Sequence, residues 1–180
     1  MKKIILTVFA ATSLLLYSTP SFAFSISLGM PMGHTVTGKT NGADTHEAGY
    51  DAPSGFLIGV QLPFAMGLGI DSYKTKLKET EVKLGTDMYN IFYQLPIPVI
   101  NLIIGLGTGN QALECDGCAD VFDKGSATQW YTSIGFPILP LFDIHLSYRS
   151  ITSKNINIKA SDTKLDFSGT VTGIGFAFNF

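Results

Sequence analysis

The sequence has few charged side chains for its length. Only 14% of its 180 residues are Asp, Glu, Lys or Arg, and Arg149 is the single arginine. A soluble domain of this size usually has about a quarter charged residues, so the shortage indicates that part of the exterior does not face water. The formal charge of -2 leaves no basic surface for phosphates, which argues against a nucleic-acid partner.

The sequence also lacks a long apolar run. No segment offers the ~20 apolar residues of a membrane-spanning helix, so a membrane protein of this sequence must cross with strands. The stretch 4–17 is shorter, follows two lysines, and leads to the small-residue exit Ser21-Phe22-Ala23. We therefore predict a secretory signal peptide over residues 1–23 and one exported domain over residues 24–180.

Cysteine is scarce as well. The only two, Cys115 and Cys118, are three positions apart, and no second pair exists with which to build a zinc site. An exported protein meets an oxidising compartment, so we expect a disulfide between them. The closed ring is very small, so this bond should stiffen its loop and add little to the stability of the fold.

Two groups of candidate metal ligands are weak. Carboxylates near the cysteines have the oxygen atoms that calcium takes, but a solvated acidic loop is the better explanation for them. A second group mixes histidines and carboxylates, as transition-metal sites do, but its histidines are too few to argue from. We predict no metal and no cofactor. The two groups are Glu114, Asp116, Asp120 and Asp123, and His34, Asp44, His46 and Glu47.

Alternation with period two is what the sequence has in abundance. From Ser168 to Phe180 one face becomes increasingly aromatic toward the end, and the other face is small or polar. The same alternation predicts an all-β chain of eight strands, each with one continuous apolar face. They are 24–32, 54–62, 66–74, 85–95, 98–108, 127–136, 141–150 and 165–180.

The connections between these strands alternate between two kinds. Three are short, apolar and rich in proline, whereas four are long and polar, which is the layout of outer-membrane barrels. A β-sandwich or a soluble barrel of lipocalin type has the same alternation with its apolar face inside. However, the non-apolar face of the last four strands is mostly Gly, Ser, Asn and Ala, which suits a crowded lumen better than a solvent face. The short connections are 62–66, 95–98 and 136–141, and the long ones 34–53, 74–84, 109–126 and 151–164.

In its signal peptide, strand layout and terminal Phe180, the chain resembles the small bacterial outer-membrane β-barrel proteins of the OmpX and OmpA transmembrane-domain type. The resemblance implies an eight-stranded antiparallel up-and-down transmembrane β-barrel in the outer membrane of a Gram-negative bacterium, reached through the periplasm. Phe176, Phe178 and Phe180 would then form the barrel-closure and assembly signal. The implied partners are outer-membrane lipid, lipopolysaccharide and the barrel assembly machinery, with the oligomeric state open.

Polar residues of two strands are predicted to meet inside this barrel. Period two puts Asp143, His145 and Arg149 on one face, and Asp71 arrives from another strand. An unpaired charge in a narrow barrel is costly, so we expect a luminal network in which Arg149 is matched by Asp143, by Asp71 or by both, unless it reaches water at the loop side.

The predicted function is a small non-enzymatic protein with a structural or surface-interaction role. Eight strands leave an interior just wide enough for side chains, and four long loops are exposed outside. The alternative is binding or transport of a small hydrophobic molecule or lipid along the glycine-lined side of the barrel.

One motif invites an enzymatic interpretation. His145-Leu146-Ser147 is similar to the His-x-Ser pair of the outer-membrane lipid A deacylase family, and period two puts both side chains on one face. However, Tyr148 stands where that family has asparagine, no suitably spaced Glu follows, and the shared face is the predicted lumen. We therefore predict no catalytic residue and no enzyme activity.

Overall fold

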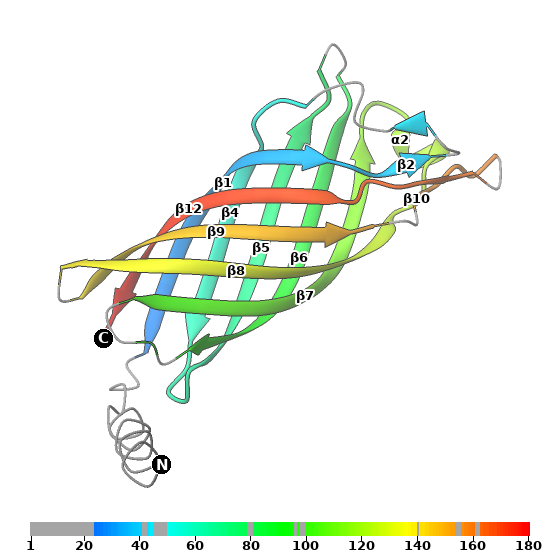
Figure 1. Cartoon of the computed structure of the whole chain (residues 1–180). Helices are drawn as coiled ribbons and strands as arrows, with labels where there is room; N and C mark the ends of the chain where they lie inside the picture. Colours follow the sequence, from blue (N-terminus) through cyan, green and yellow to red (C-terminus); the bar gives the residue numbers. More distant parts are fainter. Residues whose placement is uncertain are drawn as a thin grey trace, which may run out of the picture.

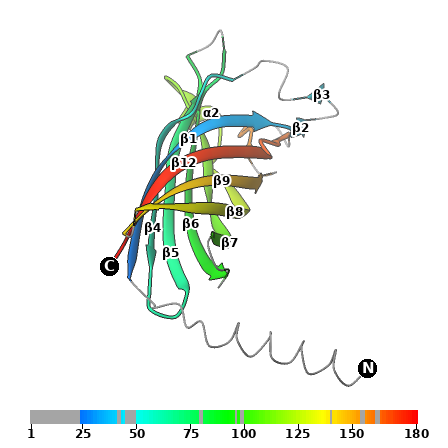
Figure 2. The same ribbon diagram turned by 60° about the vertical axis from the view of Figure 1, so that its left-hand side comes forward.

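Eight strands close into an antiparallel barrel, in which each strand pairs with its neighbours along the chain and β1 closes the ring against β12 (Figures 1 and 2). This computed structural model describes residues 24–40, 43–44, 50–78, 81–95, 97, 100–139, 141–153, 156–160 and 163–180, so the predicted signal peptide lies outside the described residues. The predicted all-β, up-and-down architecture is confirmed. The barrel strands are β1 (Ser25–Val36), β4 (Ser54–Gln61), β5 (Met66–Lys76), β6 (Lys83–Leu95), β7 (Asn101–Glu114), β8 (Gly125–Leu139), β9 (Phe142–Thr152) and β12 (Gly169–Asn179).

Smaller elements lie at the end of the barrel that carries the long loops. These are the two-stranded pairs β2 (Lys39–Thr40) with β3 (Ala43–Asp44) and β10 (Ile156–Asn157) with β11 (Lys164–Leu165), and the four-residue helix α2 (Cys118–Val121). Among the described residues, no helix is long and apolar enough to span a membrane.

The outside of the barrel is apolar and its lumen is largely polar. Leu68, Ile91 and Leu106 are more than half exposed, whereas Asp71, Asn90 and Gln129 are buried. This is the reverse of a lipocalin-type barrel, whose apolar side chains face inward. The strand faces predicted from period two are therefore correct, and the soluble alternative does not describe this structure.

Several strands run further than their apolar alternation indicated, whereas β7 and β12 begin later than predicted, at Asn101 and Gly169. β7 continues to Glu114 and β8 begins at Gly125, inside what was predicted as a long loop. At the other end β8 passes through Pro137, where a register shift lies between Pro137 and Leu139, and ends in the predicted turn. Backbone pairing does not need an apolar face, so polar residues at the loop end extend the ladder.

A small hydrophobic core covers the loop end of the barrel. It is built from side chains of β1, β6, β10 and the segment before β12, and partly buried residues of all four long connections pack against it. Burial there raises the pKa of the Tyr50 phenol to about 12. We call this core the loop cap; its buried members are Val36, Leu84, Ile156 and Phe167, and its partly buried members are Tyr50, Leu77, Leu113, Phe122 and Leu165.

Candidate functional site in the barrel lumen

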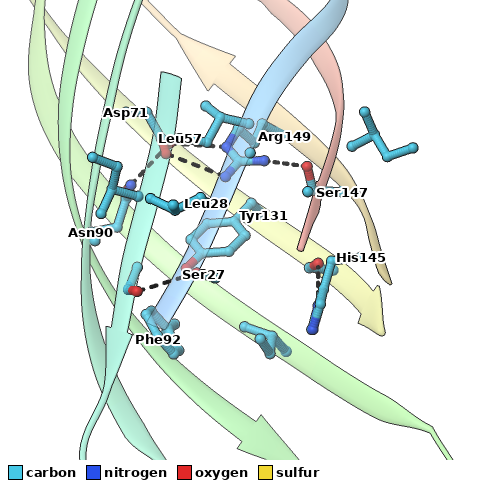
Figure 3. A pocket seen from close by; sticks show the side chains of 18 of the residues that line it. Ser27, Leu28, Leu57, Asp71, Asn90, Phe92, Tyr131, His145, Ser147 and Arg149 are labelled. Carbon is cyan, nitrogen blue, oxygen red and sulfur yellow. Dashed lines mark hydrogen bonds and ion pairs between the residues drawn. The ribbon is translucent and has the colours of Figure 1, made fainter. Parts of the chain in front are cut away.

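The centre of the lumen is an ion pair between Asp71 and Arg149. The Arg149 Nε donates to Asp71 Oδ2 at 2.9 Å and its Nη2 donates to Oδ1 at 3.3 Å. Both residues are buried, at 1% and 6% exposure. β5 and β9 lie four strands apart in either direction around the ring, so the pair spans the full width of the barrel (Figure 3).

Neutral amides complete the shell of the Asp71 carboxylate. Asn90 Nδ2 and Gln129 Nε2 both donate to Asp71 Oδ2, at 2.9 and 2.7 Å. Arg149 also donates to the Ser147 hydroxyl, and its guanidinium carbon lies 4.8 Å from the centroid of the Tyr131 ring. Each charge therefore has several partners in addition to the opposite charge, as a buried ion pair requires.

Two aromatic side chains fill the lumen beside this pair. A Cβ atom on Gly67 would lie 2.0 Å from the Phe92 ring, and one on Gly105 would lie 2.2 Å from the Tyr131 ring. Glycine is therefore needed at both positions so that each ring can lie over the neighbouring strand, where Gly67 pairs with Phe92 and Gly105 pairs with Tyr131. A cavity of about 60 Å³ lies among the side chains here, so little space is left between them.

Asp143 lies in a separate layer toward the short turns. Its carboxylate accepts hydrogen bonds from Asn101 Nδ2 and Asn179 Nδ2, and His145 Nε2 is 3.9 Å away. Of the four predicted luminal residues, the structure thus joins Asp71 to Arg149 and places Asp143 with His145. The sequence did not predict the amide side chains that bind these carboxylates, although period two put them on the polar faces of their strands. They are Asn90, Gln129, Asn101 and Asn179.

The His-x-Ser motif does not form a catalytic pair. His145 Nδ1 contacts the Ser133 hydroxyl at 3.3 Å, while the Ser147 hydroxyl accepts from Arg149 (Figure 3). No hydrogen bond joins His145 to Ser147 among the contacts of the described residues. The arrangement lacks the nucleophile–base contact of covalent catalysis.

The lumen is closed toward the loops by two further layers. Above the ion pair lies an apolar cluster of Leu57, Tyr73, Met88, Ala127, Ile151 and Val171. Above that, His34 Nδ1 lies 2.8 Å from the Thr75 hydroxyl and Gln111 donates to Thr86, followed by the loop cap. His34 therefore belongs to the lumen wall rather than to a loop metal site.

Cys115 and Cys118 form a disulfide, and Cys118 is the first residue of α2. The connection that carries it is tied to the last long connection, since Asp123 N donates to Asn157 O and Lys159 N to Val121 O. No cluster of three or more histidine, cysteine or carboxylate residues is placed to hold a metal within the described part of the chain. His46 and Glu47 lie outside it.

Comparison with known proteins places the fold. No protein-family model and no curated protein matches the sequence. The structure is similar to Neisserial surface protein A, with a TM-score of 0.64 and 12% identity over 87% of this chain and 97% of that one. This is the fold of the small outer-membrane barrels. A second example is the N-terminal β-barrel domain of Pseudomonas aeruginosa OprF, with a TM-score of 0.51 and 12% identity over 87% of this chain and 97% of that one. A third is outer membrane protein W of E. coli, with a TM-score of 0.50 and 9% identity over 90% of this chain and 100% of that one.

As in a small outer-membrane barrel, the ring is closed at the chain ends. Phe180 N donates to Phe24 O, and the two rings lie 6.2 Å apart. Phe142 of β9 contacts both Phe176 and Phe178, with ring centroids 5.3 and 4.9 Å apart. The terminal phenylalanines therefore form an aromatic cluster on the outer face at the seam.

Proposed function

We propose that this protein is a non-enzymatic outer-membrane barrel with a filled lumen, which acts as a structural or surface-interaction protein through its loops. The observation that carries the proposal is the combination of an apolar exterior with the Asp71–Arg149 pair across the lumen. An apolar exterior needs a lipid surround, and a filled lumen leaves no water-filled path.

The loops are the part of the barrel suited to contact a partner. The loop cap, the disulfide and the ties between the third and fourth long connections join the described parts of these segments to one another. Outer-membrane lipid, lipopolysaccharide and the assembly machinery are the proposed partners of the outer face and of the terminal phenylalanines.

Cell fractionation and gel migration test the membrane assignment. The protein should be recovered with the outer membrane and should migrate differently before and after boiling in SDS, because a closed hydrogen-bonded barrel resists the detergent. Recovery as a soluble periplasmic protein would contradict the assignment.

Planar-bilayer recording tests the filled lumen. The native barrel should show no stable conductance. A Phe92→Ala, Tyr131→Ala variant removes the two rings beside the ion pair but keeps the apolar cluster and the loop cap above them, so it should also stay closed and should have a lower free energy of unfolding than the native barrel. The matched control is Tyr89→Ala, Tyr93→Ala, which removes two aromatic side chains from the outer face of β6 and should stay closed as well. A steady native conductance would rule out the filled-lumen role.

A second candidate function is binding of a small hydrophobic molecule or lipid. A groove of about 420 Å³ lies over β6, β7 and β8, and its lining includes Ile91, Ile104, Leu106 and Trp130. Quenching of Trp130 by a brominated fatty acid in detergent would report binding. With Trp130 kept as the reporter, Ile104→Phe should fill the groove and weaken the quenching, whereas Ile134→Phe, outside the groove lining, should not.

A further inference from the structure

The connections at the end of the barrel opposite the loops are apolar and have no charged side chains. The three connections there, 62–66, 95–101 and 137–142, contain no Asp, Glu, Lys or Arg. Phe64 is 77% exposed and Phe180 is 70% exposed, and Leu139 and Leu141 are also mostly exposed. We call this region the turn end. Such a concentration of exposed apolar side chains marks an interaction surface.

The apolar outer face has a sharp boundary at the loop side. On β8, Trp130 is followed toward the loops by Thr128, and on β6, Tyr89 is followed by Asp87. The same change from apolar to polar occurs on other strands around the barrel. The pairs are Ile70 and Ser72, Leu106 and Thr108, Tyr148 and Ser150, and Ile174 and Thr172.

The distance from this boundary to the turn end is shorter than the thickness of a membrane's apolar layer. Trp130 and Leu139 are nine residues apart on β8, or about 23 Å along the barrel axis at ~3.3 Å a residue and a tilt of about 40°. Ile174 and Phe180 are six residues apart, or about 15 Å by the same conversion. The apolar band of an outer-membrane barrel is about 25 Å tall, so a membrane that begins at the boundary reaches the turn tips.

Several polar groups of the turn backbone are hydrogen-bonded within the protein or are absent. Leu62 N donates to Met66 O at 2.7 Å, and Gln94 N donates to Ala65 O at 2.7 Å. Five of the chain's eight prolines fall in the three connections, and proline has no N–H that would need a partner. Unsatisfied backbone groups are excluded from hydrocarbon, so these features reduce the cost of placing the turns in lipid.

We propose that the turn end is immersed in the periplasmic leaflet of the membrane, with lipid acyl chains as its occupant. This inference rests on the proposed function, since it requires the barrel to be in a membrane. Its support is the continuity of the turn end with the lipid-facing band and the absence of charge in the connections. The protein then presents a folded surface on the loop side only.

Depth-dependent fluorescence quenching tests this proposal, because Trp130 is the only tryptophan. The native barrel, in phosphatidylcholine vesicles with brominated acyl chains, uses Trp130 as an internal reporter of membrane insertion. In a Trp130→Phe background, Phe64→Trp and Leu141→Trp place reporters at two turns, so that one variant suffices if the other misfolds. Thr128→Trp is the matched control on the polar side of the boundary.

The reporters at positions 64 and 141 should be quenched by the brominated chains at least as strongly as Trp130, and iodide in the water should not reach them. The reporter at position 128 should show the opposite pattern. If Trp130 is quenched by lipid while positions 64 and 141 are quenched only by iodide, the turn end stands in water, the inference is overturned and the membrane assignment stands. If Trp130 itself is not quenched by lipid, the membrane assignment fails too.

Discussion

The Asp71–Arg149 pair gives the sharpest test of how the lumen is held together. Arg149→Met keeps an apolar stem beside Tyr131 but removes the charge, and leaves Asp71 buried with only amide donors. Breaking one partner of a buried pair typically costs about 3–5 kcal/mol. Asp71→Asn combined with Arg149→Met removes both charges and should cost less than Arg149→Met alone.

A double-mutant cycle measures the coupling directly. Urea unfolding in lipid vesicles, followed by the fluorescence of Trp130, gives the free energy of unfolding of each variant. We expect a coupling of about 0.5–3 kcal/mol between positions 71 and 149, the usual range for residues in contact. The matched cycle with Asp143→Asn should give a value near zero, because Asp143 bonds to Asn101 and Asn179 instead. Near-zero coupling at positions 71 and 149 would refute the charge-paired lumen.

Three further outcomes follow from the chain ends, the disulfide and the loop cap. Phe180→Asp should lower the amount of barrel assembled in the outer membrane, since it puts a charge into the aromatic seam, and unchanged levels would count against that role. Thiol labelling of unreduced cells should find neither Cys115 nor Cys118 free, while the double serine variant still forms a barrel; ready labelling would instead indicate a reactive pair. Phe167→Ala should destabilise the loop cap by about 3–5 kcal/mol and make the loops sensitive to protease, with the barrel's boiling-dependent migration retained; equal resistance to protease would show that the cap does not order the loops.

Period two was enough to predict which residues face outward, because most outer positions between the loop-side boundary and the turns are apolar whatever their neighbours are. It could not predict the partner of Arg149. Asp71 and Asp143 share the luminal face, and the choice between them depends on which residues of opposite strands reach the same height. That height is set by the stagger of all eight strands around the ring, which no single strand encodes.

The loop end was the least predictable part for a related reason. Above the apolar boundary, Asn110 and Gln111 continue β7 with no alternation to mark them. The loop cap brings together Val36, Leu84 and Phe167, which are isolated apolar residues in long polar stretches. Only the closed barrel puts these stretches side by side, so their contacts cannot be read from local sequence.

The unequal charge of the two ends gives the barrel a preferred direction of insertion. Every lysine of residues 24–180 lies in the long connections or in the strand ends beside them, and each charge at mid-membrane costs about 2.5–3.5 kcal/mol on insertion scales. In empty vesicles the end without charged side chains in its connections should therefore cross first, which leaves the loops on the side from which the protein was added. Under the proposed delivery from the periplasm, the charged loops would instead have to cross the membrane, and the proposed assembly machinery would act at this step.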